Sequence, residues 1–349
     1  MLHSMDELYM GRCIMLAKLG NGNVAPNPMV GAVLVYENRI IGEGYHQYYG
    51  GNHAEVNCFE SVADADKPMM EKATLYVSLE PCAHYGKTPP CANRIITEKV
   101  KKVVIGCVDN FAAVNGKGIA ILQQAGIEVT VGVLEDDCKK LNKHFFTFHE
   151  KNRPFITLKY AETNNHFIGN ISNERLLITN NITNTWVHKI RSEHTAILVG
   201  SRTVIKDNPT LTVRLWTGKN PVRMVIDKEN NLPKNLHLFT DKNATITFNT
   251  VSQAENGDKK LIKLAAHLPI LTQIMQYCYA QPFQSILVEG GSQLLQLFIN
   301  ENLWDEAIVI TNKKLCIPVG IKAPEWKQRW LQNSYSFGSD AIAIYQNKP

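Results

Sequence analysis

Two segments place the strongest constraint on the fold of this 349-residue chain: His53-Ala-Glu55, and Pro81-Cys82 followed by Cys91. Their imidazole, carboxylate and two thiols act together only if the fold brings these distant residues to one point. Two thiolates and a neutral imidazole form the ligand set of a zinc ion whose fourth position stays open to water. The ion lowers the pKa of that water towards neutrality. We therefore predict a metal centre in which His53, Cys82 and Cys91 are the ligands.

Glu55 follows His53 by two residues, and we expect its carboxylate beside the metal without ligating it. A carboxylate in that place transfers protons during hydrolysis, so Glu55 is the predicted catalytic residue. Two interpretations compete: a polar helix start with two incidental thiols, and a structural zinc closed by four ligands. The acid at the fourth candidate position disfavours a structural zinc. Zinc-dependent base deaminases use the same H-x-E segment, followed by P-C-x-x-C.

The spacing of the two cysteines departs from that signature, because eight residues separate Cys82 from Cys91. The insert carries three hydrogen-bond donors, His84, Lys87 and Thr88. A ribose phosphate requires such donors, whereas a free base does not. The insert therefore favours a phosphorylated substrate, although Lys87 alone has the alternative of a solvated surface lysine.

The first part of the chain, residues 1–149, alternates helical and strand patterns. An amphipathic helix is predicted within residues 1–20. Further helices are predicted over 53–63, 92–98, 118–125 and 135–148, and strands over 30–35, 40–45, 73–79, 103–108 and 127–133. This alternation indicates a three-layer α/β unit. His53 then lies at a helix start and Cys82 at a strand end, where open α/β sheets place their sites.

A polar segment over residues 150–154 is a plausible joint, after which the alternation restarts. Strands are predicted over 155–160, 196–199, 222–226, 244–248, 285–288 and 307–310, and helices over 184–191 and 293–300. Gly290-Gly291 stands between a strand and a helix, where bare backbone N–H groups suit a phosphate, although a plain turn is the alternative. The pattern predicts a second α/β domain over residues 150–349.

Composition and charge exclude several classes of function. Hydrophobic residues make up 44% of the chain and charged residues 20%, as in ordinary globular proteins. The net charge of +5 comes without a dense run of Lys or Arg, so we expect no nucleic-acid partner. We find no signal peptide and no apolar run long enough for a membrane span, and we expect a cytoplasmic protein with reduced thiols.

Four longer motifs carry a family resemblance. They are Ala25-Pro-Asn-Pro-Met-Val-Gly31, Gly44-Tyr-His46, His53-Ala-Glu55 and Glu80-Pro-Cys-Ala-His-Tyr-Gly-Lys-Thr-Pro-Pro-Cys91. With them the chain resembles the bifunctional riboflavin-biosynthesis deaminase/reductases over nearly its whole length. The resemblance implies a cytidine-deaminase-like α/β/α domain followed by a dihydrofolate-reductase-like α/β domain, and Zn²⁺ and NADPH as cofactors. It also implies a homo-oligomer, either a dimer or a tetramer, and 2,5-diamino-6-ribosylamino-4-pyrimidinone 5′-phosphate as the substrate.

The resemblance further assigns residues to each half of the reaction. Substrate-binding residues of the deaminase are Asn27, His46, His84, Lys87 and Thr88. Substrate-binding residues of the reductase are Lys159, Arg191, Leu211, Arg214 and Glu289. Residues that bind NADPH are Ala161, Thr203, Asp207, Gly290, Gly291 and Ser292.

The second half departs from the family pattern in two places. Thr163-Asn-Asn-His166 replaces a Ser-Leu-Asp-Gly-like turn, and Arg175 and Leu177 replace a serine and a tryptophan. These departures favour an alternative in which the second half is a binding or dimerisation module without catalysis. Another alternative is a deaminase that acts on a different pyrimidine or on nucleic acid, against which the donor-rich insert and the modest charge argue.

Overall fold

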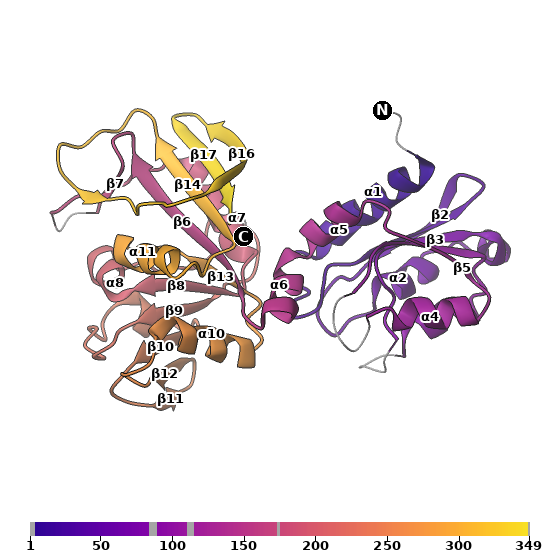
Figure 1. The fold of residues 1–349 in the computed structure, drawn as a ribbon, viewed down its shortest axis with the longest axis horizontal. Coiled ribbons are helices and arrows are strands. Elements are labelled where there is room, and N and C mark those ends of the chain that lie inside the picture. The colour runs from indigo at the N-terminus through magenta and orange to yellow at the C-terminus, as the bar shows by residue number, and fades with distance from the viewer. Residues whose placement is uncertain (1–3, 84–88, 110–114, 173–174, 348–349) are drawn as a thin grey trace. The chain divides into compact units, whose positions relative to one another are not determined.

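The structure is a computed structural model that describes residues 4–83, 89–109, 115–172 and 175–347. The chain forms two compact units, Met1–Asn152 and Arg153–Pro349 (Figure 1). Each unit has its own β-sheet with apolar clusters on both faces. Within the described residues, no helix combines the length and the apolar character that crossing a bilayer requires.

The sheet of the first unit has five strands in the order β2-β1-β3-β4-β5. They are β1 (Gly31–Tyr36), β2 (Arg39–Tyr45), β3 (Thr74–Leu79), β4 (Lys102–Cys107) and β5 (Glu128–Val131). β1 is antiparallel to β2 and to β3, whereas β3, β4 and β5 run parallel. Glu37 and Asn38 both have positive φ, which the two-residue turn between β1 and β2 requires.

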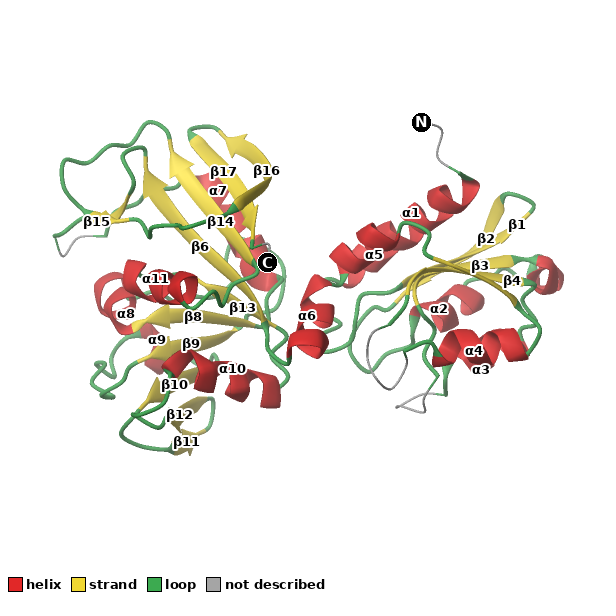
Figure 2. Cartoon of the chain, viewed as in Figure 1, coloured by secondary structure: helices red, strands yellow, loops and turns green. Residues whose placement is uncertain are grey.

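Helices cover both faces of this sheet (Figure 2). α1 (Met5–Ala17), α5 (Glu135–Leu141) and α6 (Lys143–Lys151) join one apolar cluster, and α2 (Ala54–Glu60), α3 (Cys91–Thr97) and α4 (Lys117–Gln124) join the other. Two short 3₁₀ helices, η1 (Lys18–Gly20) and η2 (Lys67–Lys72), complete the unit. Along β1, Val33 and Val35 join the first cluster and Ala32 and Leu34 the second, as the alternation of strand side chains requires. The predicted α/β/α layering is confirmed.

The single helix predicted over residues 135–148 is wrong, because the chain forms α5 and α6 with a break at Asn142. The Asn142 side chain accepts a hydrogen bond from the Met29 N–H and donates one to the Met29 carbonyl, both at 2.8 Å. Asn142 is buried and has non-helical φ and ψ of −107° and 27°. The break therefore lets one amide side chain bind both the N–H and the carbonyl of Met29, in the segment that leads into β1.

The sheet of the second unit has ten strands in the order β11-β12-β10-β9-β8-β13-β6-β14-β17-β16. Seven strands that follow one another in this spatial order are parallel to their neighbours. They are β12 (Lys259–Lys263), β10 (Thr245–Asn249), β9 (Val222–Ile226), β8 (Ala196–Gly200), β13 (Ser285–Val288), β6 (Phe155–Thr163) and β14 (Glu306–Asn312). Antiparallel pairs add β11 (Ala254–Asn256), β17 (Asp340–Gln346) and β16 (Trp330–Phe337). β7 (Phe167–Gly169) and β15 (Ile321–Lys322) form a separate pair. Because β13 lies between β8 and β6, the carboxyl ends of these three strands meet.

Two groups of helices cover this sheet. α10 (Ile270–Ala280) and α11 (Ser292–Asn300) pack on one face, and α7 (Asn181–Ser192), α8 (Ser201–Asp207) and α9 (His237–Thr240) contribute to the cluster on the other. The mixed α/β class predicted for this half is confirmed. The sequence pattern did not predict α10 or the β16–β17 hairpin, and it ended β6 three residues early, at Tyr160. β16 is an edge strand whose central residues are exposed, so its sequence lacks the apolar alternation that indicates a strand.

Candidate active sites

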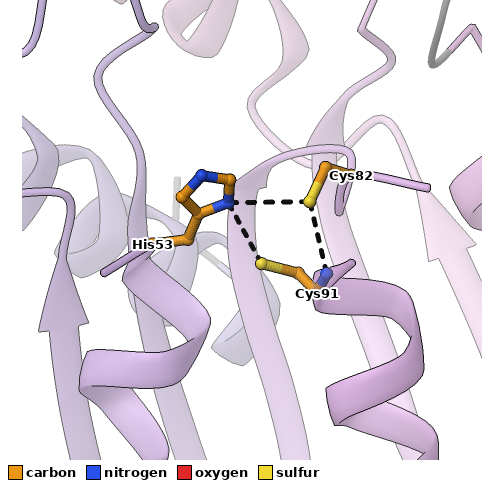
Figure 3. A group of neighbouring side chains, drawn as sticks. All are labelled: His53, Cys82 and Cys91. Atoms are coloured by element: carbon orange, nitrogen blue, oxygen red, sulfur yellow. Dashed lines mark hydrogen bonds between the residues drawn. The ribbon is translucent and has the colours of Figure 1, made fainter. Parts of the chain in front are cut away.

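The first unit brings the three predicted metal ligands together. His53 is the N-cap residue of α2, Cys91 is the first residue of α3, and Cys82 lies just beyond the end of β3. Their ligand atoms all lie within 4.8 Å of one another. His53 Nδ1 is 3.2 Å from Cys91 Sγ and 3.6 Å from Cys82 Sγ (Figure 3).

These three side chains fit a zinc ion. Bonds of about 2.0 Å to nitrogen and 2.3 Å to sulfur at tetrahedral angles place ligand atoms about 3.5 Å apart. The two measured N–S distances lie on either side of that value. The hydrogen bond between the thiols lowers the pKa of Cys82 and raises that of Cys91, so Cys82 is the readier thiolate. Three soft ligands leave the fourth tetrahedral position for water.

Glu55 lies on the first turn of α2 and is not one of the three clustered ligands. Its side chain is buried, and burial raises its pKa. It is close enough to Cys91 for a hydrogen bond between the carboxylate and the thiol. The carboxylate therefore adjoins the metal ligands, and burial, by raising its pKa, makes it a stronger proton acceptor.

Asn27 and His46 form a hydrogen-bonded pair beside this centre. His46 Nδ1 lies 2.9 Å from the Asn52 carbonyl, which can only accept, so Nδ1 carries the proton. His46 Nε2 is then an acceptor, and Asn27 Nδ2 donates to it over 3.1 Å. The His46 ring also packs edge-on against the His53 ring, with centroids 5.5 Å apart. Of the other predicted substrate-binding residues, His84, Lys87 and Thr88 lie outside the described residues.

The second unit gathers three charged side chains at the ends of its central strands. Lys159 comes from β6, Arg191 from the last turn of α7, and Glu289 directly follows β13. Arg191 Nε and Nη2 each donate to one Glu289 oxygen over 2.8 Å, and Lys159 Nζ lies 3.8 Å from Glu289 Oε2. All three side chains are nearly buried. Burial alone raises the pKa of Glu289, but Arg191 and Lys159 outweigh it and lower the value to about 2.

Leu211 and Arg214 lie on the loop after α8, beside this cluster. Leu211 is buried with a positive φ of 54°. Arg191 Nη1 donates to the Thr212 carbonyl over 3.3 Å, and Arg214 Nη1 approaches the Thr212 hydroxyl at 3.4 Å. The cluster thus joins three cations, Lys159, Arg191 and Arg214, to one carboxylate, which leaves a net positive charge.

His188 belongs to this cluster and was not predicted from the sequence. It is buried on α7, and its Nδ1 accepts a hydrogen bond of 2.9 Å from the Arg214 N–H. Burial, together with the charges of Arg191 and Arg214, lowers the pKa of His188 to about 4. The helical spacing to Arg191, three residues later on the same face, was the signal that could have found it.

The six residues predicted to bind NADPH come from β6, from α8 and from the segment where β13 leads into α11. Ala161 is on β6, Thr203 and Asp207 are on α8, and Gly290, Gly291 and Ser292 lead into α11. The Gly200 N–H donates to the Gly290 carbonyl over 3.0 Å. A Cβ added at Gly291 would lie 3.2 Å from Thr203 Oγ1, so the bare backbone faces this hydroxyl closely. An uncovered backbone at a helix start fits a cofactor phosphate.

The two departures from the family pattern have a structural outcome. In the turn after β6, His166 has a positive φ of 62°, and its Nδ1 lies 3.0 Å from Glu162 Oε1. Asn165 contacts the Thr163 hydroxyl and donates to the Ile317 carbonyl over 2.7 Å. Leu177 is exposed. Arg175 is close enough to the cluster to lower the pKa of Lys159 and of Arg214, so it adds positive charge there.

Two family models match the chain. The cytidine and deoxycytidylate deaminase zinc-binding region matches residues 3–107, and the RibD C-terminal domain matches residues 154–315. With the geometry above, they define the class: a zinc-binding deaminase domain joined to a second α/β enzyme domain.

Relatives along the full chain identify the family. The riboflavin biosynthesis protein RibD of Aquifex aeolicus is 38% identical over 90% of this chain and 89% of its own length. RibD of Escherichia coli is 34% identical over 89% and 88%. A deaminase/uracil reductase from Thermotoga maritima matches with a TM-score of 0.89 and 37% identity, covering 98% of both chains. RibD of Acinetobacter baumannii matches with a TM-score of 0.90 and 30% identity, covering 99% of both.

The chain belongs to the RibD family of riboflavin biosynthesis proteins. It is a bifunctional enzyme with a zinc-dependent deaminase domain and an NADPH-dependent reductase domain. The alternative in which the second half is a non-catalytic module is not favoured.

Proposed function

We propose that the chain hydrolyses the 2-amino group of 2,5-diamino-6-ribosylamino-4-pyrimidinone 5′-phosphate and then reduces the ribosyl chain of the product to a ribityl chain. Residues 1–149 would carry the first step and residues 150–349 the second. The observation that carries the proposal is the closeness of His53, Cys82 and Cys91 beside a buried Glu55, in a chain whose other unit holds a cationic cluster.

In the deaminase step, His53, Cys82 and Cys91 would hold the zinc ion, which supplies an activated water at neutral pH. Glu55 would accept a proton of that water and pass it to the ring nitrogen. It would then move the remaining hydroxyl proton to the departing amino group, so that ammonia leaves as a carbonyl forms. Asn27 donates one amide N–H to His46 Nε2 and would present its Oδ1 to a donor of the substrate. His84, Lys87 and Thr88 are proposed to bind the ribose phosphate.

In the reductase step, NADPH supplies the hydride, and the protein supplies binding and alignment. Lys159, Arg191 and Arg214 would bind the substrate phosphate, because their summed charge exceeds that of Glu289. Leu211 and Glu289 would complete the substrate site. NADPH would be bound by Ala161, Thr203, Asp207, Gly290, Gly291 and Ser292.

The test supplies the diaminopyrimidinone phosphate with and without NADPH and identifies the products by mass. Without NADPH we expect exchange of one amino group for oxygen and release of ammonia. With NADPH we expect the further gain of two hydrogens. Reduction without deamination, or no reaction of the phosphate while a free base or an oligonucleotide loses ammonia, would contradict the proposal.

Two further properties complete the proposal. Thiol ligands require a reducing environment, and all eight cysteines are free, which supports a cytoplasmic enzyme. We also infer a homo-oligomer, a dimer or a tetramer, which light scattering of the purified chain would test.

A further inference from the structure

Glu80 is a buried carboxylate that stands between β3 and the metal ligand Cys82, with a side chain that none of the roles above uses. The residue is 4% exposed. Its Oε2 accepts hydrogen bonds from the Asp109 and Gly116 N–H groups at 3.2 and 3.0 Å. Its Oε1 accepts from the Gly118 and Ile119 N–H groups at 2.9 and 3.3 Å. Four backbone groups, two from the segment between β4 and α4 and two from the first turn of α4, therefore converge on one side chain.

Among the described residues, the first turn of α4 offers the N–H groups of Gly118 and Ile119 no acceptor of its own. Gly118 and Ile119 are the second and third residues of α4, whose N–H groups have no partner within the helix. The N-cap residue, Gly116, has no side chain to accept from them. The four hydrogen bonds recorded for the Glu80 carboxylate in the described part of the chain all come from these backbone donors. The negative charge also suits the positive end of the helix dipole.

The first turn of α4 is also pressed against the peptide that precedes Cys82. A Cβ added at Gly118 would lie 2.0 Å from the Pro81 carbonyl oxygen and 3.2 Å from Glu80 Oε1. The Glu80 N–H donates to the Cys107 carbonyl over 3.0 Å, which extends the pairing of β3 with β4. Residues 80 and 81 are therefore held from the sheet on one side and from α4 on the other.

The contacts of Glu80 and Pro81 also restrict the position of Cys82, the next residue along the chain. The Cys82 carbonyl accepts from the Ala92 N–H and Cys82 Sγ accepts from the Cys91 N–H, both at 3.2 Å. Those bonds tie Cys82 to α3, which carries another ligand. The anchor at Glu80 ties it to the sheet, which fixes the distance between α3 and the strand ends.

We propose that Glu80 is a positioning residue of the metal centre: its carboxylate locks α4 against Pro81 and thereby holds Cys82 at ligating distance from His53 and Cys91. The proposal rests on the metal centre of the proposed deaminase. Its test therefore measures metal exchange directly, so that it can fail while deamination stands, or stand where deamination of the named substrate fails.

The experiment compares Glu80→Gln with the wild-type chain by the rate at which bound zinc passes to excess chromogenic chelator. Gln keeps the size of the side chain but turns an amide N–H₂ towards backbone donors. We expect zinc release to accelerate about 10- to 100-fold, the usual effect of losing an outer-shell partner of a metal ligand. We expect kcat of deamination to fall more than KM changes, and NADPH-dependent reduction of the deaminated substrate to stay unchanged. Glu128→Gln, which loses an exposed pair with Lys102, is the matched control and should change neither readout.

A second variant separates positioning from general destabilisation. Gly118→Ala leaves the carboxylate intact but forces α4 away from Pro81, so it should reproduce the faster zinc release. Hydrogen exchange should show lost protection at residues 115–119 and retained protection in β4 for both variants. Zinc release at the wild-type rate in both variants would overturn the proposal. Faster release accompanied by loss of protection throughout the sheet would also overturn it, because unfolding would then explain the metal loss.

Discussion

Removing the charge of Glu289 tests whether the cationic cluster is held together electrostatically. In Glu289→Gln, the side chain keeps its size and resembles the protonated acid. The surrounding cations lower the pKa of Glu289 from 4.5 to about 2 in spite of its burial. A shift of about 2.5 units corresponds to about 3 kcal/mol, because each unit is worth about 1.4 kcal/mol. We therefore expect the variant to lose about 3 kcal/mol in the free energy of unfolding of the reductase domain near pH 7.

The assay exploits the distribution of tryptophan. All five tryptophans of the chain lie in residues 153–349, so their fluorescence reports urea unfolding of the reductase domain alone. A carboxylate whose pKa is lower in the folded state contributes stability above its unfolded value and loses it as the pH falls through the folded value. The difference between wild type and variant should therefore be full above about pH 4.5 and shrink towards about pH 2.

Glu193→Gln is the control for this prediction. Glu193 pairs with Lys189 one turn away on the same helix, and this partly exposed pair should contribute no more than about 0.5 kcal/mol. The reasoning is refuted if Glu289→Gln unfolds at the same urea concentration as wild type, or if its deficit persists unchanged as the pH approaches the folded pKa of Glu289.

Three further predictions concern the two sites. Glu55→Gln should retain stoichiometric zinc, measured by metal analysis, while ammonia release falls by about 10²- to 10⁴-fold; normal turnover would contradict the assignment. Arg214→Ala should raise KM for the phosphorylated substrate about tenfold or more with a smaller change in kcat, because a charge-assisted hydrogen bond is lost; equal effects on a dephosphorylated substrate would argue against a phosphate contact. The pKa of His188 is about 4 in the folded state, whereas in the unfolded chain the imidazole binds a proton below about pH 6.5. The free energy of unfolding should therefore decrease as the pH is lowered from about 6.5 to about 4. His188→Asn should flatten that slope in urea titrations followed by tryptophan fluorescence, and an unchanged slope would show that other groups cause it.

The clustering of the predicted metal ligands could be foreseen because zinc binding depends on a few residue types. His53, Glu55, Cys82 and Cys91 are identifiable from residue type and spacing, and the alternating pattern placed them at helix starts and a strand end. Strands such as β9 and β13, which are mostly buried, also coincide with the predicted ranges. These features depend on local sequence, and local sequence is what a pattern records.

The residues that sequence reasoning missed act through partners that only the tertiary fold supplies. Glu80 binds backbone N–H groups 29 to 39 residues away, and Asn142 binds Met29 across 113 residues. His188 resembles any polar residue of an amphipathic helix until Arg214 is placed beside it. The β16–β17 hairpin depends on pairing with β14 and not on an apolar pattern of its own. Of these residues, His188 leaves a local signal in its helical spacing to Arg191, whereas the distant partners of Glu80 and Asn142 leave none in residue type.

The carbonyl of Asn52 sets the orientation of the Asn27 side chain, which it does not contact, through the ring of His46. The Asn52 carbonyl accepts from His46 Nδ1–H, so Nε2 is left as an acceptor and binds one of the two N–H groups of the Asn27 amide. This bond fixes the orientation of the amide: Asn27 Oδ1 can only accept hydrogen bonds, while the second N–H on Nδ2 can still donate. A backbone carbonyl thus determines, through one imidazole, which atoms of the Asn27 side chain stay available for hydrogen bonds.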